Sequence, residues 1–128
     1  MPMLYRVEDN LGEGMYHSSN APSLGMHNEI RHPSPREDSK LYDGIKILLK
    51  KRGDIAFNFS LFKYGFSSLG QLKSWIYKKE WKKGLHKAGF SLSIYKCEEE
   101  NFVAGDTQAV VLLNTHIELI ERKSLLEI

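Results

Sequence analysis

Residues 68–95 read SLGQLKSWIYKKEWKKGLHKAGFSLSIY and hold the clearest helix pattern and the clearest strand pattern of the chain. Ser68 and Gln71 have the spacing of a capping box, in which side chains three positions apart satisfy backbone amides at a helix start. Apolar residues then recur at helical spacing: Leu69, Leu72, Trp75, Ile76, Trp81, Leu85 and Ala88. We therefore predict one main amphipathic helix over about 68–88, which Gly84 could weaken or divide.

The residues after this helix alternate between apolar and polar. Gly89 fits the left-handed position just past a helix end, and residues 90–95 then show the period of two of a half-buried strand. Similar reasoning predicts a helix at 41–51 and further strands at 4–7 and 108–113. The strands at 90–95 and 108–113 are expected to form a hairpin.

Two segments leave alternatives open. Residues 55–66 fit either a strand or an extended segment that packs aromatic side chains onto the core. In 116–128, Thr115 with Glu118 could cap a helix, whereas the alternation of Ile117 and Leu119 favours a strand through Ile120. The predicted class is α+β, a mostly antiparallel sheet with one main helix.

The chain of 128 residues is expected to form a single domain over 1–128, with an irregular loop at 17–40 and a C-terminal extension at 114–128. A single cysteine, Cys97, excludes an internal disulfide and a cysteine-rich zinc site. Neither an apolar run of about 20 residues nor an export signal is present, so we expect a cytoplasmic protein without a membrane partner.

The net charge of +2 conceals three differently charged segments. Residues 1–45 carry a net charge of −3, residues 46–90 carry +9 and residues 91–128 carry −4. Much of the positive charge falls on the predicted main helix, where the candidate partner-binding residues are Lys78, Lys79, Lys82 and Lys83. These lysines suit an acidic protein partner or simply a solvated helix face. Nucleic acid is a less favoured partner, because the helix contains no arginine to read bases.

The N-terminal stretch LYRVEDNLGEGMY (4–16) is the most suggestive of ligand binding. Tyr5 and Arg6 fall on a predicted strand, and a strand-borne arginine can hold a phosphate through two hydrogen bonds. Gly12 and Gly14 would let the backbone approach a ligand, with Tyr16 beside them. The simpler alternative is an exposed turn.

The predicted loop holds His27 and His32, which we also take as ligand-binding candidates. Together with Glu37 and Asp38 these side chains are of metal-binding types, but their spacing matches no known metal motif, so we predict no metal site. Cys97 precedes three glutamates, whose charges would raise the thiol pKa, and a structural cysteine is therefore expected rather than a nucleophile.

Several stretches resemble a family of small uncharacterised proteins of tailed bacteriophages. The similarity covers about residues 3–113 and is carried by LYRVED, GEGMY, HNEIRHPSPRED, YGFSSLGQLKSW, LHKAGFSLSIYKC and GDTQAVV. This resemblance implies a phage accessory protein acting in the cytoplasm of an infected bacterium, with no activity attached.

The opening Tyr-Arg strand, the glycine-rich turn and the late strand pair are also similar to the ADP-ribosyltransferase fold. That family begins its late strand with a catalytic glutamate, and the matching residue here is Gln108. A neutral amide keeps a hydrogen bond but loses most of the electrostatic stabilisation that the carboxylate supplies. The resemblance, with Gln108 as a further ligand-binding candidate, therefore implies binding more than ADP-ribosyl transfer.

Three hypotheses of function follow. The first is a phage protein that counteracts a host defence by sequestering a nucleotide or an ADP-ribose-like ligand. The second is an ADP-ribosyltransferase-like enzyme that modifies a host target, and the third is a direct inhibitor of a host defence complex through the lysine-rich helix. We predict no resident cofactor; NAD or an ADP-ribose derivative is a candidate ligand.

Overall fold

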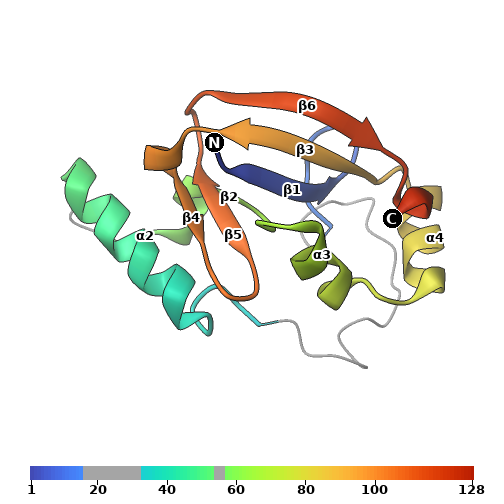
Figure 1. The fold of residues 1–128 in the computed structure, drawn as a ribbon, viewed down its shortest axis with the longest axis horizontal. Coiled ribbons are helices and arrows are strands. Elements are labelled where there is room, and N and C mark those ends of the chain that lie inside the picture. The colour runs from blue at the N-terminus through green and yellow to red at the C-terminus, as the bar shows by residue number, and fades with distance from the viewer. Residues whose placement is uncertain (16–32, 54–56) are drawn as a thin grey trace.

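The computed structural model describes residues 1–15, 33–53 and 57–128, whose strands form two antiparallel sheets of three strands each. The strand order is β1-β3-β6 in the first sheet and β2-β5-β4 in the second (Figure 1). The strands are β1 (Met3–Glu8), β2 (Phe62–Gly65), β3 (Ser91–Cys97), β4 (Phe102–Ala104), β5 (Ala109–Leu112) and β6 (Ile117–Lys123). The predicted α+β class with a mostly antiparallel sheet is confirmed.

Three α-helices accompany the sheets in the described part of the chain. They are α2 (Ser39–Arg52), α3 (Leu69–Trp75) and α4 (Lys79–Lys87), and short 3-10 turns are η1 (Phe59–Leu61), η2 (Glu99–Asn101) and η3 (Leu125–Glu127). Figure 1 shows α2 beside β4 at one end of the molecule and α4 at the other end, next to the C-terminus. None of these helices has the length and apolarity needed to cross a bilayer.

The two sheets meet where β2 runs onto β1. Tyr5 and Phe66 exchange two backbone hydrogen bonds, each 2.8 Å long. A Cβ atom on Gly65 would lie 2.6 Å from the carbonyl oxygen of Tyr5, so the approach of the two backbones requires glycine at this position. This junction brings the N-terminal strand and the second sheet together around one site.

The predicted single helix over 68–88 is wrong in its continuity. It is divided into α3 and α4 by residues 76–78, and the division is not at Gly84. Trp75 and Trp81 are both buried in the same core, yet on a straight helix they would point roughly 120° apart. The break turns α4 so that both tryptophans face one core. The cap at Ser68 is confirmed, since its hydroxyl accepts from the Gln71 amide at 3.1 Å.

The predicted hairpin between 90–95 and 108–113 is also wrong. Both edges of β3 are taken, by β1 and β6, while β5 lies between β2 and β4 in the other sheet. The hairpin that does form joins β4 to β5, and the Gly105 amide donates to the Gln108 carbonyl at 2.8 Å across its turn. With three residues, β4 is too short for an alternating pattern to reveal it.

Other boundaries differ less. The predicted loop 17–40 gives way to α2 at Ser39, two residues before the predicted helix start at 41, because Asp38 caps the helix. Residues 17–32 of that loop lie outside the described residues. The open choice at 116–128 is resolved as a strand, β6, which runs to Lys123 and is followed by η3. Within 57–66, the part of the segment 55–66 that the structure describes, the strand is the short β2 alone.

The buried apolar side chains fall into three clusters. One lies where sheet β1-β3-β6 meets α3 and α4, the second lies between α2 and sheet β2-β5-β4, and the third joins the two sheets. The joining cluster consists of Leu4, Tyr95, Cys97, Ala109 and Val111. Segments distant in sequence are thereby held against β2, which forms one wall of the cavity described next.

Candidate functional site

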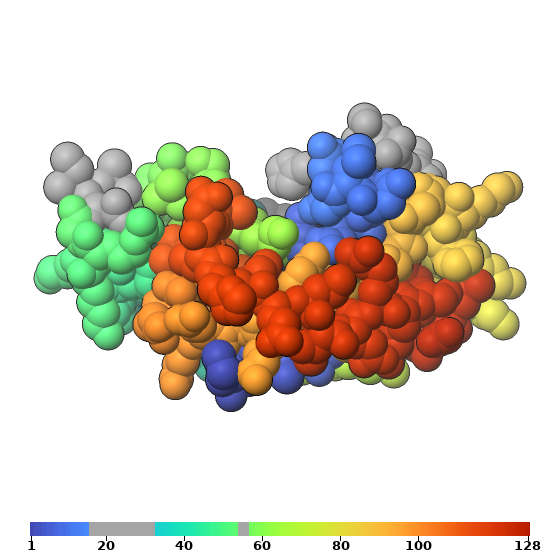
Figure 2. Space-filling view, turned by 90° about the horizontal axis from the view of Figure 1, so that it is seen from above, coloured from blue at the N-terminus to red at the C-terminus, as the bar shows by residue number. Residues whose placement is uncertain are grey.

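An open cavity of about 1110 Å³ lies along β2, between the loop that follows β1 and the residues that precede α2. Figure 2 shows the surface hollowed between the blue loop after β1 and the green segment that leads into β2. Half of the twenty lining residues are apolar or aromatic: Val7, Met15, Pro33, Pro35, Phe59, Phe62, Tyr64, Phe66, Trp75 and Leu113. The charged lining residues are Arg6, Arg36, Lys63 and Glu13.

Four of the predicted ligand-binding residues line this cavity, namely Arg6, Gly12, Gly14 and Gln108. They come from the two ends of the described chain and meet here through the junction of the sheets. Tyr5 is not among the lining residues, and its side chain packs against the core cluster beside α3 and α4. Tyr16, His27 and His32 lie outside the described residues.

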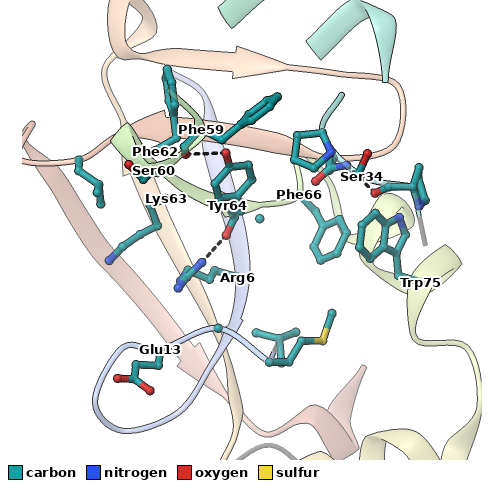
Figure 3. Close-up of a pocket in the computed structure, with 18 of the residues that line it drawn as sticks. Arg6, Glu13, Ser34, Phe59, Ser60, Phe62, Lys63, Tyr64, Phe66 and Trp75 are labelled. Atoms are coloured by element: carbon teal, nitrogen blue, oxygen red, sulfur yellow. Dashed lines mark hydrogen bonds between the residues drawn. The ribbon is translucent and has the colours of Figure 1, made fainter. Parts of the chain in front are cut away.

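Arg6 is held in the cavity wall by its own chain. Its Nη1 donates to the Tyr64 carbonyl at 2.5 Å (Figure 3). Its Nε donates to Glu8 Oε1 at 2.9 Å and its Nη2 to the Gly12 carbonyl at 3.1 Å. Three of the five donors of the guanidinium are thereby used. Arg6 thus joins β1, β2 and the glycine loop, a structural role that the phosphate-clamp prediction did not include.

Glu8 is fully buried beneath this arginine and collects further partners. Its Oε2 accepts from the Tyr95 hydroxyl and lies 3.4 Å from Nη2 of Arg122, whose Nε donates to Ser93 Oγ at 3.2 Å. Burial, followed by the hydrogen bond to the Glu8 carboxylate and its charge, raises the pKa of Tyr95. Sequence reasoning missed this cluster, because β1, β3 and β6 bring it together only in the folded sheet.

The glycine loop is shaped around Arg6. A Cβ atom on Gly14 would lie 3.2 Å from Nη2 of Arg6, and Gly12 has a φ of 81°, a left-handed conformation that favours glycine. The buried Asp9 carboxylate accepts from the amides of Leu11 and Glu13, each at 2.9 Å. Both glycines therefore serve the loop geometry that the GxG pattern suggested.

Gln108 and Asp38 fasten the opposite wall, residues 33–36. Gln108 is buried, and its Nε2 donates to the Pro33 carbonyl at 3.0 Å. Asp38 is also buried and accepts from Thr107 N and Oγ1, both at 2.8 Å, and from Asp106 N at 3.1 Å, besides Leu41 N in its own helix. The Gln108 side chain thus bonds to the Pro33 carbonyl, whereas the resemblance to ADP-ribosyltransferases implied that it would bind a ligand.

The hydrogen bonds at Asp38 decide its titration. Burial is the largest influence and opposes ionisation, but the bonds from Thr107, Asp106 and Leu41 together outweigh it and lower the pKa of Asp38 below its ordinary 3.8. The carboxylate is therefore charged near neutral pH. It needs no cation, because backbone amides surround it.

Arg36 and Lys63 are the cavity cations that sequence reasoning missed. The Arg36 guanidinium lies 5.6 Å from the Phe59 ring centre, and the Lys63 ammonium lies 5.3 Å from that of Tyr95. Figure 3 shows Arg6 and Lys63 on one side of the cavity, Phe66 and Trp75 on the other, and the Glu13 carboxylate turned away from them. Because Glu8 offsets the charge of Arg6, Arg36 and Lys63 are the cations best placed to attract an anion.

The four lysines predicted to contact a partner have different surroundings. Lys79 and Lys83 are exposed on α4. Lys82 donates to the carbonyl of Ile128 at 3.0 Å, and the Lys78 ammonium lies over the Trp81 ring at 5.3 Å. Two of the four therefore make contacts within the chain, and a protein partner at this helix stays a prediction.

No three His, Cys, Asp or Glu side chains lie close enough to hold a metal ion within residues 1–15, 33–53 and 57–128. Asp38, whose side chain is of a metal-binding type, is a helix cap. Cys97 is buried, and burial is the main cause that raises its thiol pKa. The direction agrees with the prediction, although the cause is burial in place of the neighbouring glutamates.

Comparison with known proteins yields one match. A family model described as "Bacteriophage T4 Y00F protein" matches residues 1–125. No curated protein and no solved structure matches the chain. The predicted phage resemblance is thus confirmed at the level of a phage protein family, whereas the resemblance to ADP-ribosyltransferases finds no support.

Proposed function

The chain belongs to this bacteriophage family, and we propose that it binds and sequesters a nucleotide-like ligand in the cavity along β2. In an infected bacterium, such a protein would act as an accessory factor that withdraws a nucleotide signal from a host defence. The function needs affinity and no turnover.

The observation that carries the proposal is the composition of the cavity wall. Half-buried aromatic side chains such as Phe59 and Tyr64 supply apolar surface for a ring, and Arg36 and Lys63 supply positive charge for a phosphate. Its volume of about 1110 Å³ slightly exceeds the roughly 300–1,000 Å³ usual for small-molecule sites, which leaves room for a ligand as large as a nucleotide. A flat ring joined to an anionic group is the ligand chemistry that fits both features.

The rigidity of the wall supports the same proposal. Arg6 ties β1, β2 and the glycine loop together, and Gln108 and Asp38 anchor residues 33–36. A site whose walls are already hydrogen-bonded loses little conformational entropy on binding, which favours affinity. Arg6 contributes mainly by holding this geometry, with two of its five donors left over.

Binding is tested by thermal shift and calorimetry with ADP, NAD, ADP-ribose and cyclic dinucleotides. A ligand that binds only the folded protein raises its stability by about 2.7 kcal/mol at a hundredfold excess over Kd. Lys63→Gln and Arg36→Gln are each expected to weaken binding about 5- to 20-fold, since each removes one charge-assisted contact.

Lys83→Gln is the matched control, because it removes the same charge from exposed α4, outside the cavity lining. It should leave Kd unchanged. If no nucleotide of the series binds, or if Lys83→Gln weakens binding as much as Lys63→Gln does, the cavity is not the site.

A further inference from the structure

The outer edge of β2 runs along the cavity, and its hydrogen-bond register can be read from three contacts. The Leu113 amide donates to the Leu61 carbonyl at 2.8 Å, so residues 61, 63 and 65 direct their backbone groups toward β5. Residues 62, 64 and 66 therefore direct theirs to the other side. The pairing of Phe66 with Tyr5 and the bond from Arg6 to the Tyr64 carbonyl agree with this register.

Phe62 and Tyr64 each direct one backbone amide and one carbonyl outward, and two of these four groups have hydrogen-bond partners in the chain. The Phe62 amide donates to the Phe59 carbonyl, and the Tyr64 carbonyl accepts from Arg6. The Phe62 carbonyl and the Tyr64 amide have no partner within the described ranges of the chain. An acceptor and a donor thus stand next to each other at a cavity wall formed by these same two residues.

We propose that these two groups bind the edge of a nucleobase that carries a donor and an acceptor side by side, as adenine does. The proposal rests on the function proposed above and deepens it by naming the ligand class. The exocyclic amine of adenine would donate to the Phe62 carbonyl, and the adjacent ring nitrogen would accept from the Tyr64 amide. The apolar wall would cover the ring, and Arg36 or Lys63 would meet the phosphates.

The same edge is poorly suited to an added peptide strand. A strand that continues the sheet in the antiparallel sense uses the amide and the carbonyl of every outward residue. Here the Phe62 amide and the Tyr64 carbonyl are already occupied, by η1 on one side and Arg6 on the other. What remains is one acceptor and one donor, which a planar heterocycle can satisfy within a single molecule.

Amide hydrogen exchange measured by NMR tests the geometry directly. In the free protein the Tyr64 amide should exchange much faster than those of Lys63 and Gly65, which face β5 and serve as controls in the same strand. Saturating ADP should slow exchange of the Tyr64 amide at least about tenfold, as expected for an amide that becomes hydrogen-bonded and shielded. The exchange of Lys63 and Gly65 should change less.

A ligand pair tests the base edge. In 1,N6-etheno-ADP the ring nitrogen and the amine of adenine are joined in a second ring, so both hydrogen-bonding functions are blocked while the phosphates are kept. We expect it to bind at least about tenfold more weakly than ADP, because two polar groups of the protein would be buried without partners.

The outcomes separate the two proposals. Suppose that ADP binds and that Lys63→Gln weakens its binding as expected, but that ADP leaves exchange of the Tyr64 amide unchanged and binds no better than its etheno analogue. The cavity is then the binding site, and the inference that β2 binds the base edge is overturned. Slow exchange of the Tyr64 amide in the free protein would also overturn it, since the chain itself would then cover the edge. If no nucleotide binds in any assay, the proposed function fails as well.

Discussion

Glu8 and Asp38 are two of the buried carboxylates that hold the cavity walls, and they are stabilised in different ways. Glu8 lies 2.9 Å from one arginine and 3.4 Å from a second, so cations compensate its charge. Asp38 is compensated by neutral donors, three backbone amides and one hydroxyl. A buried charge can be balanced by an opposite charge or by oriented dipoles, and the two solutions respond differently to mutation and pH.

The largest effect should follow from leaving Glu8 without its main partner. Arg6→Met keeps much of the side-chain volume but removes the shorter ion pair, so a charged carboxylate stays buried with only the longer contact to Arg122 and the hydrogen bond from the Tyr95 hydroxyl. We expect a loss of about 3–5 kcal/mol in the free energy of unfolding, measured by urea denaturation.

Arg122→Met is the matched comparison for that variant. The Arg122 side chain is 47% exposed, so solvent screens its pair with Glu8, and the expected loss is at most ~1 kcal/mol. Equal losses in the two variants would show that Glu8 does not depend mainly on Arg6.

Asp38→Ala should come second in magnitude. It removes a helix cap and leaves the amides of Asp106 and Thr107 without an acceptor, for an expected loss of about 2–3 kcal/mol. Asp43→Ala, an exposed carboxylate in the same helix, should change stability by less than ~0.5 kcal/mol. A small effect at Asp38 would mean that the turn holds without it.

Gly105→Ala tests the space beside the same carboxylate. A Cβ atom there would lie 2.4 Å from Asp38 Oδ2 and 2.6 Å from Leu41 Cβ, so the turn or the helix must move. We expect a loss of about 1–2 kcal/mol in chemical denaturation. Gly70→Ala, with its nearest neighbour at 3.7 Å inside α3, should be neutral or stabilising, and the opposite ranking would contradict the packing described here.

The smallest expected effect is the pH dependence of the stability that the Asp38 carboxylate contributes. Because the pKa of Asp38 is lower in the folded protein than its ordinary 3.8, its ionisation stabilises the fold above that value, and the contribution disappears as pH falls through the folded pKa. In unfolding measurements between pH 6 and pH 2, the stability difference between wild type and Asp38→Asn should therefore narrow with falling pH. A difference that stays constant would mean that the hydrogen bonds at Asp38 do not favour its charged form.

Local patterns predicted the parts of the fold that depend on local interactions. The capping serine at 68, the strand at 90–95 and the helix near 41–51 were found because period and capping act within a few residues. The hairpin prediction failed because β3 pairs with distant segments: its partners lie at least 20 positions away in β6 and at least 83 positions away in β1. The helix break at 76–78 was missed because two tryptophans must reach one core.

The candidate site shows the same division. Arg6, Gly12 and Gly14 were identified from residue chemistry and Gln108 from the resemblance to ADP-ribosyltransferases, and all four line one cavity. Arg36, Lys63 and the outer edge of β2 were not identified. Nothing in the residues next to them in the sequence indicates that they face a cavity. Whether these groups can bind a ligand depends on which of the polar groups around them already have hydrogen-bond or ion-pair partners.

The sequence by itself determined the α+β class, the phage family and the residue types able to hold an anionic ligand, because period, capping and motif order are properties of short stretches. Only the tertiary structure decided that Arg6 pairs with Glu8 and that Gln108 bonds to Pro33. It also decided that, among the described residues, one donor and one acceptor on the outer edge of β2 have no partner. The physical reason is that hydrogen-bonding capacity is shared among all groups within reach, and the fold alone determines which groups those are.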